Sequence, residues 1–190
     1  MDKPVLGLAM CGSYCTYSQV FAALPELAAR FALVPILSEN AAATDSRFGT
    51  AEAHRNTLEA ICGRTAITTI GEAEPIGPKK LLDALLIVPC TGNTLAKLAH
   101  GIADSTVTLA AKAHLRNGRP VIVAVSTNDG LAAAAPNLGT LLSRKHYYFV
   151  PFRQDDPLKK PCSLVADFTR MGDAVAAALE GRQLQPLLLA

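Results

Sequence analysis

The sequence predicts a single doubly wound α/β domain spanning residues 1–190, and three observations support that fold class. Residues 5–10, 32–37, 84–88 and 120–125 form nearly continuous apolar runs, which are typical of strands buried on both faces of a parallel sheet. Segments with a helical spacing of apolar residues alternate with these runs, so helices should cross over between parallel strands. Half of the 190 residues are hydrophobic, which is enough for one substantial core.

The individual elements follow from periodicity, caps and chain breakers. Strands are expected at residues 5–10, 32–37, 65–70, 84–88, 120–125 and 147–151. Helices are expected at residues 17–31, 50–62, 95–100, 105–116, 138–144 and 173–180, with Asp104 as the N-cap of the fourth. Three connections carry polar or chain-breaking residues: a mobile surface loop at 40–49, a stiff connection at 72–78 whose part 75–78 cannot be regular helix, and a polar loop at 153–157.

Composition and charge exclude several classes of function. The net charge is +2 and basic residues are interspersed with acidic ones, so no basic face favours nucleic acid or an anionic membrane. The first apolar run is too short for a secretory signal and no run approaches a membrane span, so we expect a cytosolic protein. The five cysteines are then expected to be reduced. Cys11 and Cys15 lack a second pair of ligands at zinc-site spacing, so no metal site is expected.

The most informative stretch is Pro89-Cys90-Thr91-Gly92-Asn93-Thr94, which joins a predicted buried strand to a predicted helix. The start of a helix presents free backbone N–H groups and the positive end of the helix dipole. The threonine hydroxyls and the Asn93 amide add donors and acceptors that a purely apolar core would not need. The stretch therefore indicates a site for an anion or an electron-rich ring. An ordinary capped turn, with Thr91 or Asn93 as the N-cap, is the alternative.

Other small polar residues follow the remaining predicted strands. Gly12 and Ser13 come after the first, Ser38 after the second, and the segment 126–130 after the strand 120–125. Parallel strands bring their carboxyl ends to one edge of a sheet, so these segments should converge with the central stretch. Arg47 is either a solvated cation or a residue that binds a substrate carboxylate through two hydrogen bonds from its guanidinium.

The sixteen positions 89–104, which contain Pro89-Cys90-Thr91-Gly92-Asn93-Thr94 and Gly101-Ile102-Ala103-Asp104, resemble the signature of the flavin-dependent cysteine decarboxylases and flavin prenyltransferases. This resemblance implies a flavodoxin-like, Rossmann-like three-layer sandwich that binds FMN. It implies that the phosphate lies on Gly12, Ser13, Thr16 and Ser38. It also implies that the flavin ring lies near Cys90, Thr91, Gly92, Thr94 and Ser126.

Within that superfamily, the segments 44–49, 72–78, 126–130 and 148–152 resemble the family of dipicolinate synthase B subunits. The resemblance implies a protein that acts with the NAD(P)-binding A subunit of the synthase to oxidise dihydrodipicolinate in the mother cell of a sporulating bacterium. Asn93 and Arg47 are then the candidate residues for holding this small dicarboxylate. Cys90 is interpreted as a buried strand-end residue, because aromatisation needs no covalent intermediate.

Departures from the related enzymes favour this interpretation over the alternatives. The segment 72–78 has no histidine, whereas the cysteine decarboxylases carry one there. The segment 126–128 replaces both the methionine-asparagine clamp of the decarboxylases and the arginine-glutamate pair of the prenyltransferases. An FMN-dependent decarboxylase, a flavin prenyltransferase and a non-catalytic flavin-binding or regulatory subunit stay open as alternatives. The resemblance also implies a homo-oligomer built from trimers, with the apolar tail 187–189 packed on a neighbouring protomer.

Overall fold

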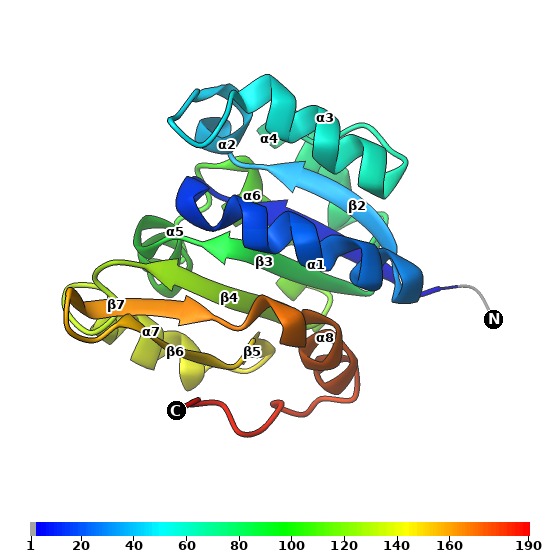
Figure 1. Ribbon diagram of the computed structural model, residues 1–190. Helices are drawn as coiled ribbons and strands as arrows, with labels where there is room; N and C mark the ends of the chain where they lie inside the picture. The colour runs from blue at the N-terminus through cyan, green and yellow to red at the C-terminus, as the bar shows by residue number, and fades with distance from the viewer. Residues whose placement is uncertain (1–2) are drawn as a thin grey trace.

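The computed structural model describes residues 3–190 and has a seven-stranded sheet at its centre (Figure 1). The strand order is β2-β1-β3-β4-β7-β6, and β5 also pairs with β4. The strands are β1 (Val5–Met10), β2 (Ala32–Leu37), β3 (Ala84–Cys90), β4 (Val121–Thr127), β5 (Tyr147–Phe149), β6 (Phe152–Asp156) and β7 (Lys160–Ala166). β1 to β5 pair in parallel, whereas β7 runs antiparallel to both β4 and β6. The predicted doubly wound α/β class is confirmed, with an antiparallel hairpin added at one edge.

Helices cover both faces of this sheet. They are α1 (Tyr17–Arg30), α2 (Glu39–Ala43), α3 (Ala51–Cys62), α4 (Ile70–Ala73), α5 (Gly92–His100), α6 (Thr106–Leu115), α7 (Ala135–Leu142) and α8 (Met171–Leu179). Short 3₁₀ turns form at η1 (Tyr14–Thr16), η2 (Glu74–Ile76) and η3 (Phe168–Arg170). In Figure 1, α1 and α8 lie in front of the strands, while α5 and α6 lie behind them. No helix within residues 3–190 is long and apolar enough to cross a membrane.

Three predicted elements were wrong, each for an identifiable reason. Residues 65–70 form no strand, because only Ile67 bridges to β2 before Thr69 caps α4. Residues 40–49 are not wholly loop, because the Ser38 hydroxyl accepts from the Ala41 N–H at 3.2 Å and starts α2. Residues 153–157 lie mostly in β6, whose alternating burial was hidden by its charged side chains. Charged residues are common on such edge strands because they discourage pairing with other chains.

Helix caps decide two further details. The N-cap of α6 is Ser105 and not Asp104. Ser105 and Thr108 form a capping box: the Ser105 hydroxyl accepts from the Thr108 N–H, and the Thr108 hydroxyl accepts from the Ser105 N–H. Asp104 instead pairs with Lys97 at 2.8 Å. Glu72 closes the capping box of α4 by accepting from the Thr69 N–H at 3.1 Å. Hydrogen bonds to that carboxylate lower the pKa of Glu72, so it stays ionised and structural.

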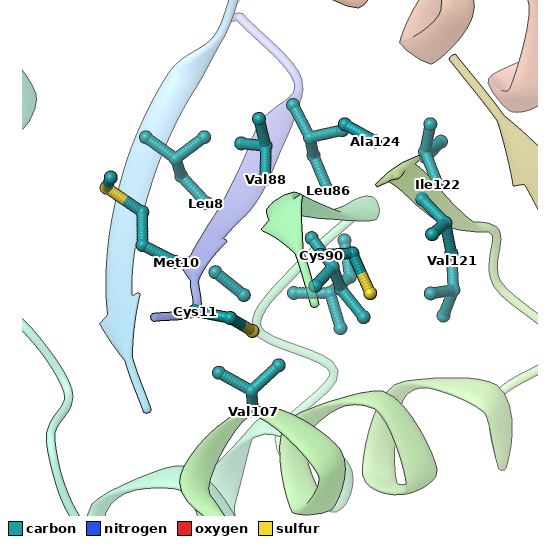
Figure 2. Packing of buried hydrophobic residues seen from close by; sticks show 14 of the residues in the cluster. Leu8, Met10, Cys11, Leu86, Val88, Cys90, Val107, Val121, Ile122 and Ala124 are labelled. Atoms are coloured by element: carbon teal, nitrogen blue, oxygen red, sulfur yellow. The ribbon is translucent and has the colours of Figure 1, made fainter. Parts of the chain in front are cut away.

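The core is one hydrophobic cluster that fills both sides of the central strands. All seven residues of β3 are buried, as expected for a strand at the centre of a parallel sheet. Figure 2 shows Leu8, Leu86 and Val88 on one side of the strands, and Cys11 and Cys90 on the side toward Val107 of α6. The two cysteines are therefore part of the core, directly beneath the edge where the predicted site lies.

The apolar tail packs on its own chain. The Phe152 N–H donates to the Leu187 carbonyl at 3.0 Å, and the Leu189 N–H donates back to the Phe152 carbonyl at 3.0 Å. Leu187 packs against the core, whereas Leu188 is 70% exposed. Leu188 thus leaves an apolar side chain available for a neighbouring protomer, and the expected contact between protomers stays a prediction.

Candidate functional site

Two cavities lie at the carboxyl edge of the sheet and share Thr91. The larger, about 570 Å³, is lined by residues that follow β1, β2 and β3, among them Gly12, Ser38 and Asn93. The smaller, about 160 Å³, lies beside the ends of β1 and β4 and next to β7. Ligands of doubly wound proteins bind at this edge, so the sheet topology by itself favours these cavities.

Thr91 organises the start of α5. It is the N-cap: its hydroxyl accepts from the Thr94 N–H at 3.2 Å and lies 3.0 Å from the Thr94 hydroxyl. The Thr94 hydroxyl in turn lies 3.3 Å from Cys11 Sγ. The alternative of a capped turn is therefore realised at Thr91, but the cap also aligns two hydroxyl groups with the end of β1. At the other end, Gly101 adopts a left-handed conformation that closes α5.

A second hydroxyl cluster joins the first loop to β4. The Ser13 hydroxyl donates to the Ser126 carbonyl at 3.0 Å and lies 2.9 Å from the Ser126 hydroxyl. The Thr16 hydroxyl is 3.4 Å from the same Ser126 hydroxyl and donates to the Ser13 carbonyl at 2.9 Å. Thr16 and Ser126 are buried. Rotatable hydroxyls of this kind can turn toward an anion without a change in charge.

The larger cavity has a mixed electrostatic lining. The Asn93 amide is exposed to it and makes no side-chain hydrogen bond to another residue in 3–190. Lys97 and Asp104 form the ion pair on one wall. The Glu39 carboxylate, on another wall, accepts from the Thr106 N–H and hydroxyl, both at 2.8 Å. Since the cation and both carboxylates already have partners, the Asn93 amide is the group best placed to contact a ligand.

Gly92, at the first position of α5, lies in close contact with the loop after β4. A Cβ atom there would lie 2.7 Å from Asp129 Oδ1 and 2.8 Å from Thr127 Oγ1. The Thr127 hydroxyl donates a hydrogen bond to the Asp129 carboxylate. This hydrogen-bonded pair, in the loop after β4, lies directly against the backbone at the start of α5. This contact sets the spacing between the two loops that border the smaller cavity.

The two buried thiols beneath the site, those of Cys11 and Cys90, are protonated at neutral pH. Burial raises the pKa of Cys11 to about 11, opposed by hydrogen bonds to Thr94 and Thr91. Burial also raises the pKa of Cys90 well above the usual thiol value, with the neighbouring Cys11 acting in the same direction. A neutral buried thiol is a poor nucleophile. This result agrees with the interpretation of Cys90 as a core residue.

The structure separates the predicted phosphate residues into two groups. Gly12 and Ser38 line the larger cavity, whereas Ser13 and Thr16 line the smaller one. Arg47 lines neither cavity, and its guanidinium lies over the Phe48 ring at 4.9 Å from the centroid.

The predicted ring-binding residues are also divided between the cavities. Thr91 borders both, Thr94 borders the larger and Ser126 borders the smaller. Cys90 and Gly92 line neither cavity, although they flank Thr91 in the chain.

Sequence reasoning missed several lining residues. The hydroxyl of Tyr14 donates to the Asn40 carbonyl at 2.8 Å, so its ring closes one side of the larger cavity. Asp155 and Ser163 reach the smaller cavity from the unpredicted hairpin β6–β7. Lys97 had a signal in the sequence, since it lies one helical turn after Asn93 on the same face of α5. In residues 3–190, no three His, Cys, Asp or Glu side chains gather to form a metal site.

Comparison with known proteins gives consistent matches. Residues 2–144 match the family model described as Flavoprotein. The chain is 44% identical over 185 residues to the B subunit of dipicolinate synthase from Bacillus subtilis (strain 168), covering 97% of this chain and 92% of that protein. The crystal structure of the dipicolinate synthase B subunit from Bacillus halodurans matches with a TM-score of 0.90 and 38% identity, covering 100% of this chain and 97% of the other. The FMN-dependent cysteine decarboxylase SpaF shares the fold, with a TM-score of 0.63 and 21% identity over 94% of this chain and 97% of that one.

Proposed function

We propose, from the premise that this chain belongs to the Flavoprotein family and within it to the dipicolinate synthase B subunits, that it is the flavin-binding component of such a synthase. In this role it acts with the NAD(P)-binding A subunit to oxidise dihydrodipicolinate to dipicolinate in the cytoplasm of a sporulating mother cell. The observation that carries the proposal is the convergence of the ends of β1, β3 and β4. Their hydroxyl-bearing residues meet through the Ser13–Ser126 contact and border two cavities that share Thr91.

The donor set at this edge fits FMN. A phosphate needs hydrogen-bond donors, and the loop after β1 supplies the Ser13 and Thr16 hydroxyls beside the backbone N–H groups that open η1 and α1. Gly12 and Ser38 border the adjoining space. Thr91 and Thr94 at the start of α5, together with Ser126 of β4, would hold the ring. Bound flavin, like a nicotinamide held by the A subunit, supplies an acceptor for the hydride that leaves the substrate.

In that reaction, the residues of this chain would hold the two carboxylates of the substrate. Dihydrodipicolinate becomes aromatic when it loses one hydride and one proton, and both of its carboxylates must be held in place meanwhile. The Asn93 amide would donate to one carboxylate at the start of α5, where the helix dipole also favours negative charge. Arg47 would reach the second carboxylate from the segment between α2 and α3. Cys90 takes no covalent part.

The flavin assignment is tested by reconstitution with FMN and a charge placed in the first loop. The wild-type chain should retain one FMN per chain after desalting. Ser13→Asp should weaken FMN binding at least about tenfold, because a carboxylate would face the phosphate. Thr57→Asp, an exposed position on α3, is the matched control and should leave the affinity unchanged. The chain has no tryptophan, so flavin fluorescence can be read directly.

Two results would contradict the assignment. One is a wild-type chain that binds no FMN at saturating concentration. The other is equal FMN affinity in Ser13→Asp and Thr57→Asp. If FMN binds as expected but the A subunit turns over substrate equally well without this chain, the non-catalytic, regulatory alternative replaces the proposal.

We further propose that the chain forms a homo-oligomer built from trimers. Leu158 at the tip of the β6–β7 hairpin is 94% exposed, and Leu188 in the tail is 70% exposed. Exposed apolar side chains on two separate segments favour burial between protomers. Sedimentation of the wild-type protein as a 20.0 kDa monomer at micromolar concentration would contradict this.

A further inference from the structure

A third cavity lies away from the carboxyl edge, between α5, α6 and the turn that joins α7 to β5. Its volume is about 550 Å³, within the range of small-molecule sites. It opens beside Gly101, which ends α5. Its lining shares no residue with the larger cavity at the carboxyl edge, although the two linings are neighbours in the chain at Lys97 and Leu98 and again at Ala103 and Asp104.

The floor of this cavity is apolar. Leu98 is buried at 4% exposure, Leu115 and Tyr147 are half-buried, and Ile102 is 48% exposed at the mouth. Burial raises the pKa of Tyr147 to about 12, so its hydroxyl keeps its proton and remains a donor at neutral pH. A concave apolar surface with a polar donor is suited to a ring or a short carbon chain.

The rim of the cavity carries basic side chains that have no acidic partner within residues 3–190. Lys112, Arg116 and Lys145 form no ion pair with another residue in the part of the chain that the structure describes. The lining, as described in residues 3–190, contains no carboxylate. Arg144 differs, because its guanidinium donates to the Leu98 and Ala99 carbonyls at 3.2 and 2.6 Å and so closes the end of α5.

Helix dipoles explain only part of this arrangement. Lys112 and Arg116 lie in and just after the last turn of α6, where cations are favourable. That effect does not account for Lys145, which lies after α7 and lines the same cavity. His146 beside it adopts a left-handed backbone with φ of 67°, a costly conformation for a residue other than glycine. Three cations that have no acidic partner within residues 3–190 thus surround one apolar hollow from two separate segments.

We propose that this cavity binds an organic anion that carries two or more negative charges on an apolar body, at a site distinct from the flavin site. The cations at the rim would hold its phosphates or carboxylates, while the floor formed by Leu98, Leu115 and Tyr147 would receive its apolar part. Nucleotides and aromatic polycarboxylates share this chemistry. The inference goes beyond the proposed function and does not depend on it.

The test is a binding titration of the wild-type chain with four probes at low salt. ATP and benzene-1,3,5-tricarboxylate represent the two sources of the anion, tripolyphosphate represents charge alone, and adenosine represents the apolar part alone. We expect saturable binding of ATP or the tricarboxylate, and at least about tenfold weaker binding of tripolyphosphate and adenosine. Whichever of the first two binds more tightly identifies the source. Binding should weaken as salt is raised.

Matched variants place the site. Lys112→Ala/Arg116→Ala should weaken binding of the preferred probe at least about tenfold, because two charges are lost from the rim. Lys79→Ala/Lys159→Ala removes two exposed lysines elsewhere and should leave the affinity unchanged. All four side chains lie outside the hydrophobic core, so folding should survive, and FMN affinity in both double variants checks the flavin site independently.

Three results would overturn the proposal. They are no binding of either organic anion, binding of tripolyphosphate as tight as that of ATP, and equal loss in the two double variants. Failure of the wild-type chain to bind FMN would instead refute the proposed function and leave this proposal standing.

Discussion

Replacing Gly92 by alanine tests whether the contact between the α5 start and the loop after β4 is as close as the structure shows. The added Cβ atom would lie 2.7 Å from Asp129 Oδ1 and 2.8 Å from Thr127 Oγ1. Carbon atoms do not approach oxygen so closely without displacement, so the polar pair must move. Overpacking of this kind costs roughly 1 to 3 kcal/mol, while alanine in a helix gains about 0.5 to 1 kcal/mol over glycine. The net expectation is a loss of about 0 to 2.5 kcal/mol in the free energy of unfolding.

Gly139 provides the matched control. It lies in α7 with no atom within 4 Å of an added Cβ, so Gly139→Ala should stabilise the protein by up to about 1 kcal/mol. Urea unfolding at one fixed protein concentration compares the two variants. In an Asp129→Ala background the cost of Gly92→Ala should shrink, because one of the two opposing side chains is gone. A Gly92→Ala variant as stable as Gly139→Ala would refute the close contact.

The remaining predictions concern titrating groups. Burial, aided by Arg119, lowers the pKa of His114 from 6.5 to about 4, so the unfolded chain binds the extra proton between these values and stability must fall as pH decreases through them. Between pH 7 and pH 4.5 this should remove roughly 2 kcal/mol from the free energy of unfolding of wild type, a loss that His114→Gln should not show in urea titrations at the two pH values. In native protein at pH 8, iodoacetamide should modify exposed Cys15 well before Cys11 or Cys90, whose raised pKa values keep them as thiols, and mass spectrometry that finds Cys90 modified first would contradict this. Cys90→Ser should retain most of the turnover of the two-subunit enzyme, since a large loss would indicate covalent chemistry.

The parts of the fold that the sequence predicted well are those with strong local signals. The first two strands have the expected bounds, because each is an apolar run between clear chain breakers. The helix 50–62 was found because Thr50 caps it and Gly63 ends it in a left-handed conformation. In each case burial and capping act within a few residues, so the pattern is visible along the chain.

The hairpin β6–β7 was missed because its stability depends on distant partners. The strand β7 pairs with Ser126 and Thr127 of β4, which lie far away in the sequence. The charged residues of β6 give no sequence signal that predicts this pairing. The turn between the strands is held locally: the Asp156 carboxylate accepts from the Leu158 and Lys159 N–H groups at 3.2 and 3.0 Å. That pattern is typical of a turn, but it does not distinguish a hairpin from a loop.

The candidate site was predictable to a similar extent. The convergence of strand ends follows from a parallel topology, and Ser13 and Ser126 meet as that topology requires. The division into two cavities does not follow from it, because it depends on how the Thr91 cap and the Tyr14 ring are placed. Arg47 illustrates the same limit, since a lone arginine in a polar segment carries no signal for the direction of its side chain.

In the proposed two-subunit enzyme, the Asn93 amide in the larger cavity holds a carboxylate of the substrate during turnover. The decisive measurement is the kcat/KM of the enzyme reconstituted with Asn93→Ala, compared with Asn56→Ala at an exposed position of α3. We expect Asn93→Ala to lower kcat/KM by about ten- to a hundredfold, the cost of losing a hydrogen bond to a charged group, while Asn56→Ala has no effect. Arg47→Ala should lower it in the same direction. Wild-type kcat/KM in Asn93→Ala, with oligomeric state and binding to the A subunit intact, would contradict the account.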